Sequence, residues 1–289
     1  MKISVIGCDT YYRVGQSYER AQLAASLEAL GHTVYFHAIE PHQKRTDSIR
    51  SEMMGFKPDL CIFVPHEYEV DPSELRGLDF PIVLFLADDQ WRREFGLEMA
   101  ANCDYVMGNA PDSMAAYGAK SVPFEWAVFE NVWVGDETAR PHDVVFVAQH
   151  YGRRRDTIDE MREAGIDVLM RSSMPVSDMA ALMRQSKIGL NLSRSSREDK
   201  LQVKIRPFET GASGAMILTE YASCIEDSFV NDVEAVFFTT VDELIDKARY
   251  YLTHDTEREA IASAGKARVL RDHTLARRWE VLFKAVGLA

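Results

Sequence analysis

Short apolar runs alternate with helical patterns along the first half of the chain. Leucines recur at helical spacing over residues 18–30, and Gly31 is placed to end that helix. Five mostly apolar runs are expected to be strands: residues 2–7, 33–39, 59–65, 81–87 and 105–108. A sixth strand is expected at residues 121–128. Apolar strands separated by helices are typical of a parallel sheet that is covered on both faces.

A second alternating series follows a polar, irregular segment at residues 129–142. Thr240 and Glu243 have capping-box spacing at the start of one expected helix. The final helix carries an apolar stripe that includes Trp279 and Phe283, so we expect it to pack against another element. The strands expected in this series are 143–148, 166–170, 188–192, 215–219 and 234–238, and the helices are 154–164, 177–185 and 242–252.

These patterns predict an α/β protein with two doubly wound, Rossmann-like domains. The expected parts are an N-terminal domain (1–128), a linker (129–142), a C-terminal domain (143–272) and a C-terminal helix (273–289) that packs back on the first domain. The tryptophans at positions 126, 133 and 279 are expected to serve in packing rather than as sugar platforms.

The composition limits the function and the location of the protein. The formal net charge of -12 disfavours a nucleic-acid partner, because phosphate backbones select basic surfaces. No apolar run reaches the roughly 20 residues that span a bilayer, and the N-terminal sequence lacks a leader pattern, so we expect a cytoplasmic protein. The four cysteines are scattered without metal-ligand spacing, which predicts reduced, mostly buried thiols and no metal site.

Positive charge is nevertheless concentrated in two clusters of the second half. One is 153–155; the other lies within 194–206 and is interrupted by Glu198 and Asp199. Such clusters fit a small anionic ligand, although solvated loop charges explain any single residue equally well. Neither half carries GxGxxG after its first strand, and P-loop, GxSxG, HExxH and EF-hand patterns are absent. These absences disfavour dinucleotide enzymes, NTPases, serine hydrolases and metalloproteases.

The most informative stretch is residues 204–220. It predicts a short helix that carries Glu209, a turn of small residues, and then a buried strand. Glu209 should therefore lie near the carboxyl edge of a parallel sheet, where α/β proteins bind nucleotides. An ordinary acidic residue in the first turn of a helix is the alternative interpretation.

The order of motifs in the second half resembles the group 1 glycosyltransferases, which have the GT-B fold, and within them the spore-maturation CgeB-like proteins. The resemblance is carried by residues 143–147, 151–155, 188–193 and 206–209 and extends over 143–286, while the N-terminal half is only generically similar. It implies two Rossmann-like domains facing a cleft, with acceptor bound mainly by the first and nucleotide-sugar by the second. In related retaining enzymes, the second Glu of an E-x7-E motif binds the donor ribose. That Glu matches Glu209, whereas the first one falls at Leu201.

Further donor-binding residues are expected around the turns of the second domain. Arg153 and Arg154 lie between its first strand and first helix, where a diphosphate would meet a helix N-terminus, and His150 and Tyr151 belong to the same turn. Lys204 and Arg206 are expected to approach from a facing loop, and Gly15 would let the backbone of the first domain approach phosphate or acceptor.

Catalytic candidates follow two strands of the first domain. His66 ends one strand and resembles the histidine that faces the transferred sugar in related enzymes; a structural cap is its alternative role. Asp88 and Asp89 follow the next strand, and one of them could orient or deprotonate an acceptor hydroxyl while the other caps a helix over 91–100.

The resemblance therefore implies a metal-independent, retaining glycosyltransferase with no cofactor. Its substrates would be a nucleotide-sugar such as a UDP-, GDP- or dTDP-sugar and an unidentified hydroxyl acceptor. The missing carboxylate at Leu201 keeps open a catalytically weak nucleotide-sugar-binding or scaffold protein. An epimerase or phosphorylase on the same architecture is a third hypothesis, and a homodimer is compatible with the sequence.

Overall fold

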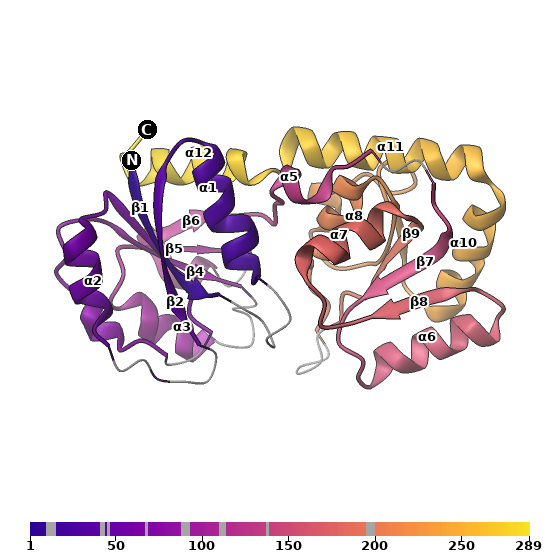
Figure 1. The fold of residues 1–289 in the computed structure, drawn as a ribbon. Coiled ribbons are helices and arrows are strands. Elements are labelled where there is room, and N and C mark those ends of the chain that lie inside the picture. Colours follow the sequence, from indigo (N-terminus) through magenta and orange to yellow (C-terminus); the bar gives the residue numbers. More distant parts are fainter. Residues whose placement is uncertain are drawn as a thin grey trace. The chain divides into compact units, whose positions relative to one another are not determined.

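The chain folds into two compact α/β units (Figure 1). The computed structural model describes residues 1–9, 16–40, 44, 47–66, 69–87, 93–109, 114–136, 139–194 and 200–289. The first unit contains Met1–Glu125 together with Leu275–Ala289, and the second contains Trp126–Thr274. The α/β class and the two parallel sheets expected from the sequence are confirmed.

The first unit is built on a sheet of six strands in the order β2-β1-β3-β4-β5-β6, all paired in parallel. The strands are β1 (Lys2–Cys8), β2 (Thr33–Ile39), β3 (Leu60–Phe63), β4 (Ile82–Leu86), β5 (Tyr105–Gly108) and β6 (Ser121–Pro123). The expectation for 121–128 was too long, because Pro123 has no N–H with which to continue a sheet ladder. β3 and β4 are buried along their whole length, as their apolar sequences predict.

The described residues of the first unit form α-helices, two 3-10 helices and one π-helix. Its helical elements are the π-helix η1 (Glu19–Ala24), α1 (Ala25–Ala29), α2 (Ile49–Phe56), the 3-10 helices η2 (Pro72–Leu75) and η4 (Ala115–Lys120), α3 (Arg93–Ala100) and α12 (Leu275–Ala285). The helix expected at 18–30 is thus split into a π-helix and an α-helix, and Gly31 ends it at φ +85° as predicted. α12 belongs to this unit, where Trp279 is fully buried and donates a 2.8 Å hydrogen bond to Ser26 Oγ.

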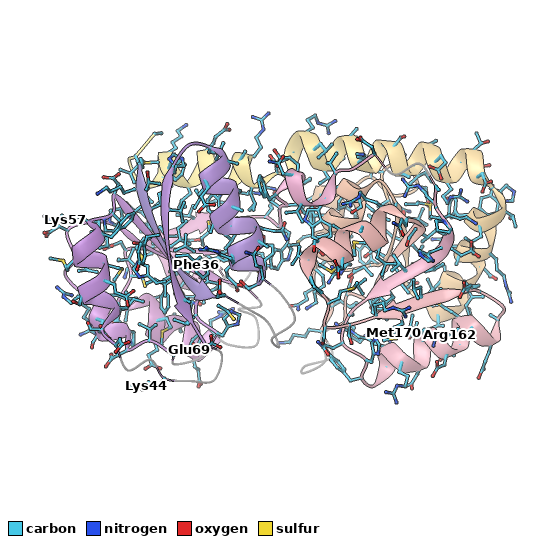
Figure 2. All side chains as sticks on the ribbon, in the orientation of Figure 1. Phe36, Lys44, Lys57, Glu69, Arg162 and Met170 are labelled. Carbon is cyan, nitrogen blue, oxygen red and sulfur yellow. The ribbon has the colours of Figure 1, made fainter. Side chains whose placement is uncertain are left out.

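The second unit carries a parallel sheet of five strands in the order β11-β10-β9-β7-β8. Its strands are β7 (His142–Val147), β8 (Val168–Arg171), β9 (Ser186–Asn191), β10 (Met216–Glu220) and β11 (Val236–Phe238). All five lie where the sequence predicts strands. Arg162 of α6 (Arg153–Glu163), labelled with Met170 of β8 in Figure 2, donates a 2.9 Å hydrogen bond to the carbonyl oxygen of Val168 and so attaches α6 to this edge strand.

Seven helices among the described residues surround this sheet. They are α5 (Glu130–Trp133), α6 (Arg153–Glu163), α7 (Val176–Arg184), α8 (Arg206–Ser213), α9 (Ile225–Ser228), α10 (Val241–Thr253) and α11 (Asp255–Asp272). The capping box of α10 is present, since Thr240 Oγ1 accepts the Glu243 N–H at 3.2 Å; Glu243 reaches back to the N–H of Thr239 at 2.8 Å. The segment 129–142, expected to be a linker, carries α5 with a fully buried Trp133 and belongs to the second unit.

The strand order of each sheet reverses at its first strand. In the first unit, β2 and β3 flank β1 on opposite sides, and in the second unit β8 and β9 flank β7 in the same way. Ligands of open α/β sheets bind beyond the carboxyl ends of the strands at such a reversal. Ligand-binding residues are therefore expected in the segments that follow β1 and β3 in the first unit, and β7 and β9 in the second.

The cysteines agree with the expectation of reduced, mostly buried thiols. Cys8, Cys61 and Cys103 are buried, Cys224 is exposed, and none is in a disulfide. Burial, with a smaller contribution from Asp104, raises the pKa of the Cys103 thiol to about 12, so this thiol stays protonated and unreactive at neutral pH.

Gly189 allows the close approach of β9 and α8, the helix that carries Glu209. A Cβ at this position would lie 3.0 Å from Thr210 Cβ and closer still to Thr210 Cγ2. We expect Gly189→Ala to lower the free energy of unfolding by about 1–3 kcal/mol through overpacking, measured by urea denaturation. Thr210→Ser removes the clashing methyl group, so the double variant should recover part of the loss. Equal stability of Gly189→Ala and the parent chain would contradict this packing.

Candidate functional site

A buried carboxylate at the end of β10 joins two arginines at the reversal point of the second sheet. Glu220 is 2% exposed, and its Oε1 accepts a 2.9 Å hydrogen bond from the guanidinium of Arg153. Its Oε2 accepts the backbone N–H of Arg194 at 3.1 Å, and the Arg194 side chain reaches 3.9 Å from Oε1. Arg153 follows β7 and Arg194 follows β9, so Glu220 ties together the two segments that the strand order singles out.

The strand ends below Glu220 form a hydrogen-bonded polar network. Asn191 Nδ2 donates to Thr219 Oγ1 at 2.8 Å and to Ser193 Oγ at 3.1 Å. Ser193 Oγ in turn donates to the carbonyl oxygen of Glu220 at 2.6 Å. Buried polar groups that are satisfied in this way hold a single arrangement, so the network fixes the backbone at the end of β10.

The N-terminus of α6 has features that favour the binding of an anion. Gly152 precedes the helix at φ +47°, a conformation that favours glycine, and Arg153 begins the helix. Arg153 keeps 44% of its side chain exposed while one of its nitrogens is bound to Glu220. The helix dipole and a guanidinium held in place can together stabilise a phosphate group at this point.

The other predicted residues of this turn lie beside the same helix start. The guanidinium of Arg154 lies over the Tyr151 ring, 4.9 Å from its centroid, and Tyr151 is 41% exposed. His150 is exposed as well. The turn after β8 contributes Ser173, which has the left-handed φ of +50° and accepts a 3.3 Å hydrogen bond from Gln149. These side chains provide aromatic and hydrogen-bonding groups at the carboxyl edge of the sheet.

The helix α8 brings two further predicted residues together. Glu209 is 3% exposed and accepts a hydrogen bond from the Arg206 guanidinium, whose same nitrogen lies 2.8 Å from Met179 Sδ. Lys204 is half-buried in the segment before this helix. Leu201, at the position of the missing motif glutamate, is 39% exposed and forms an isolated bridge with Arg194. Glu209 therefore lies at a helix start as predicted, but it is already engaged by a cation.

In the first unit, the reversal point brings a histidine and a carboxylate together. His66 follows β3, and its Nε2 lies 2.9 Å from Oε1 of Glu19, the first residue of η1. The predicted residues Gly15, Asp88 and Asp89 lie outside the described residues. Of the three catalytic predictions, His66 is therefore the one that the structure places, at the sheet edge where ligands bind.

The sequence did not single out Glu220 or Glu19 as site residues, and it marked Arg194 only as a member of the basic cluster within 194–206. The position of Glu220 at the carboxyl end of a buried strand could have identified it, because burying a carboxylate is unfavourable unless a cation or hydrogen-bond donor pairs with it. No comparable signal marked Glu19, since its partner His66 is distant in sequence. The tryptophan expectation is confirmed, because all three of the tryptophans named above are buried.

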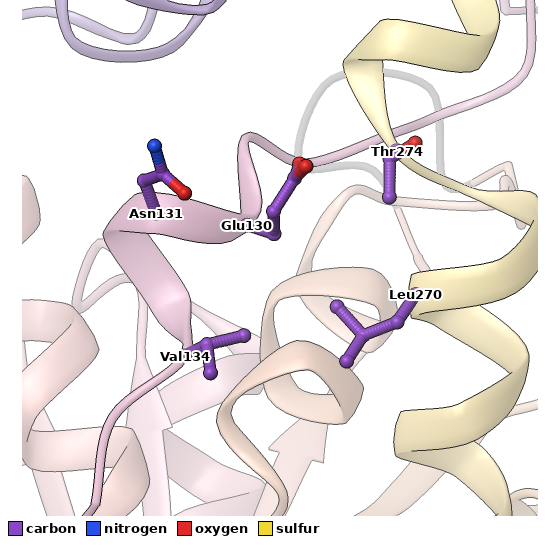
Figure 3. A pocket seen from close by; sticks show the side chains of 5 residues that line it. All are labelled: Glu130, Asn131, Val134, Leu270 and Thr274. Atoms are coloured by element: carbon purple, nitrogen blue, oxygen red, sulfur yellow. The ribbon is translucent and has the colours of Figure 1, made fainter. Parts of the chain in front are cut away.

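A surface pocket of about 540 Å³ lies elsewhere in the second unit (Figure 3). Its lining residues are Glu130, Asn131, Val134, Leu270 and Thr274. None of the predicted donor residues lines it, so it is separate from the Glu220 cluster. The residues that the structure describes contain no group of three or more His, Cys, Asp or Glu side chains arranged to hold a metal ion. Within the same residues, no helix has the length and apolar character to cross a membrane.

Comparison with known proteins identifies the family. The model of the glycosyl transferase-like family matches residues 137–284, just over half of the chain. No curated protein sequence matches the chain. The fold is similar to that of an alpha-glucosyltransferase in complex with UDP and a 13-mer DNA, at 12% identity and a TM-score of 0.73, with 99% of this chain and 100% of that chain covered.

Two further solved structures have the same fold. Sucrose-phosphate synthase from Thermosynechococcus elongatus is 11% identical, with a TM-score of 0.67 and 98% and 99% of the two chains covered. The DNA-modifying enzyme beta-glucosyltransferase is 16% identical, with a TM-score of 0.64 and both chains fully covered. These structures are GT-B glycosyltransferases, and their fold is the two-sheet architecture described above. The chain therefore belongs to the glycosyl transferase-like family and is an enzyme of the glycosyltransferase class.

Proposed function

We propose that the protein transfers a sugar from a UDP-sugar to a hydroxyl acceptor, with retention of anomeric configuration and without a metal ion, and that it belongs to the CgeB-like branch. One observation carries the proposal. A guanidinium at the N-terminus of α6 is fixed on a buried carboxylate at the reversal point of the second sheet. This is the arrangement that a departing diphosphate requires when no metal neutralises it.

The donor would lie along the carboxyl edge of the second sheet. Arg153 and Arg154 would contact the diphosphate, with Lys204 as a further cation, and Glu209 would bind the ribose hydroxyls while Arg206 holds its carboxylate in place. His150, Tyr151 and the turn at Ser173 would lie near the base. Uridine is proposed because the two glucosyltransferase structures above are described with UDP or uridine diphosphoglucose.

In the proposed reaction, the bond between the sugar C1 and the β-phosphate oxygen breaks while a bond from C1 to the acceptor oxygen forms on the same face. The departing phosphate oxygen takes the proton of the acceptor hydroxyl, so that UDP leaves with that proton. The arginines stabilise the charge that develops on the leaving group. His66 would contact the reacting sugar or acceptor, with Gly15 allowing close approach and Asp88 or Asp89 orienting the acceptor.

A second candidate function is a weakly active nucleotide-sugar-binding or scaffold protein. Leu201 favours it, because the carboxylate that holds sugar hydroxyls in related enzymes is replaced by an exposed leucine. The acceptor is proposed to be something other than nucleic acid, although both glucosyltransferase structures concern DNA, because the net charge of -12 repels phosphate backbones. A cytosolic location agrees with this proposal.

Calorimetry with UDP, GDP and dTDP in EDTA tests the donor site. We expect UDP to bind the parent chain, and Glu209→Gln to weaken binding about tenfold to hundredfold, because a charge-assisted hydrogen bond contributes about 1.5–3 kcal/mol. Glu160→Gln, which changes an exposed glutamate of α6, is the matched control and should bind UDP like the parent.

Absence of binding to every nucleoside diphosphate by the folded chain would refute the donor site. With UDP-glucose and a panel of glycan, small-molecule and hydroxymethylated DNA acceptors, transfer identifies the acceptor class, and binding without transfer to any of them favours the scaffold. The anomeric proton coupling of the product, measured by NMR, tests retention.

A further inference from the structure

The pocket in Figure 3 lies where two segments of the second unit meet. Its lining residues come from α5 and the position after it, and from the end of α11 and the second position beyond it: Glu130, Asn131, Val134, Leu270 and Thr274. A backbone bridge joins Val128 to Thr274, and the Val128 N–H donates a 3.0 Å hydrogen bond to the carbonyl oxygen of His273. The backbone therefore holds the two walls together. The volume of about 540 Å³ lies within the range of roughly 300–1,000 Å³ that is usual for small-molecule sites.

One side of the pocket is aliphatic. Val134 and Leu270 point toward each other across it in Figure 3. Val134 is 39% exposed and Leu270 is half-buried, so both keep apolar surface in contact with water. An alkyl group placed between them would remove that surface from water, which is favourable.

A carboxylate lies beside this aliphatic wall without a hydrogen-bond donor for one of its oxygens. Glu130 is half-buried, and its Oε2 atom is buried and makes no hydrogen bond within the part of the chain that the structure describes. Burial of a carboxylate oxygen without a partner is unfavourable. Because the charge of a carboxylate is shared by both oxygens and both accept hydrogen bonds, a cation at the accessible side of Glu130 would offset this cost.

The protein itself provides no cation to the pocket, since none of the five lining residues is basic. The arginines on either side of Leu270 along α11 have other partners. Arg271 pairs with Asp272 at 2.7 Å, and Arg268 donates a 2.9 Å hydrogen bond to the carbonyl oxygen of Ser228. The compensating charge must therefore come from a ligand, and the net charge of -12 favours the approach of a cation.

We propose that this pocket binds a small organic cation, namely a primary ammonium group on an unbranched alkyl chain. The ammonium group has three N–H donors, which the Glu130 carboxylate and the oxygens of Asn131 or Thr274 can accept. The alkyl chain would lie between Val134 and Leu270. The inference does not depend on the transfer reaction, because none of the residues assigned to the nucleotide-sugar lines this pocket.

The first experiment is a titration of the methyl-labelled protein with n-butylammonium chloride, followed by ¹H–¹³C NMR. The methyl signals are assigned by their loss in Val134→Ile and Leu270→Met. We expect saturable shifts of the Val134 and Leu270 signals. n-Butanol, which has the same chain without the charge, should bind at least about tenfold more weakly, because a hydrogen bond to a charged group is the stronger kind. The absence of saturable shifts at these two residues, or equal affinity for the two probes, would overturn the proposal.

Two glutamate variants locate the charge that matters. Glu130→Gln keeps the size of the side chain and should weaken n-butylammonium binding about tenfold or more. Glu160→Gln removes an equal charge from an exposed position of α6 and should bind like the parent. Parent-like affinity of Glu130→Gln, or equal weakening in both variants, would refute the assignment. Thermal unfolding shows that each variant is folded. UDP affinity should be the same in the parent and in Glu130→Gln, so the outcome at this pocket and the outcome at the proposed donor site are measured separately.

Discussion

Replacing Arg153 by alanine should lower kcat/KM by about two to three orders of magnitude, the usual loss when one preorganised group that stabilises developing charge is removed. Its guanidinium lies at the N-terminus of α6, and Glu220 fixes one of its nitrogens while 44% of the side chain stays exposed. Steady-state kinetics with UDP-glucose and the acceptor found in the screen will measure this loss.

The same substitution should lower stability modestly. Nearly half of the Arg153 side chain is in solvent, but Glu220 is 2% exposed and would lose one of its hydrogen-bond donors, so the free energy of unfolding should fall by about 1–3 kcal/mol. Urea denaturation measures this loss. A folded variant that loses two to three orders of magnitude in kcat/KM has lost a group that acts on the substrate.

Arg155 provides the control for charge. It is exposed in the same helical turn, so Arg155→Ala removes one positive charge from the same end of α6 without removing the guanidinium that Glu220 holds. We expect Arg155→Ala to retain kcat/KM within a few fold, the size of a screened surface charge effect. Equal losses in the two variants would mean that general positive charge, rather than the position of Arg153, matters.

The sequence predicted elements well where one local signal decided the outcome. The buried strand of β10 follows from its continuous apolar run, and the end of α1 follows from Gly31, whose φ of +85° a residue with a side chain rarely adopts. The capping box at Thr240 likewise depends on residues three positions apart. Such signals are complete within a few residues of chain.

The parts that sequence reasoning missed depend on contacts between distant residues. Glu220 and Arg153 are 67 residues apart, and Glu19 and His66 are 47 residues apart, so neither pair can be read from local spacing. The π-helix η1 was predicted as an ordinary helix because its leucine spacing reports only which face is buried. The strand order, which no local pattern contains, is what brings these side chains to the reversal points.

Glu220→Ala should impair both activity and stability. The carboxylate is 2% exposed and accepts from the Arg153 guanidinium and the Arg194 backbone N–H. Its removal leaves these donors unsatisfied, which should lower the free energy of unfolding by about 1–3 kcal/mol. It also releases Arg153, so kcat/KM should fall by about tenfold to hundredfold.

Thr219→Val separates these two effects. It removes the hydrogen bond that Thr219 Oγ1 of β10 accepts from Asn191 Nδ2 of β9, but leaves the neighbouring Glu220 carboxylate and both arginines in place. We expect a stability loss of about 1 kcal/mol with nearly unchanged kcat/KM. Urea denaturation and steady-state kinetics on the same preparations measure both quantities.

A double-mutant cycle decides whether Glu220 acts through Arg153. If it does, Glu220→Ala should cost little further activity in an Arg153→Ala background, because the guanidinium that it orients is already absent, and the coupling energy should be about 0.5–3 kcal/mol. Additive losses would mean that Glu220 acts on the reaction by another route, with Arg194 as the next residue to test, since its backbone N–H and side chain meet the same carboxylate. The cycle thus connects the buried charge of β10 to the chemistry at the start of α6.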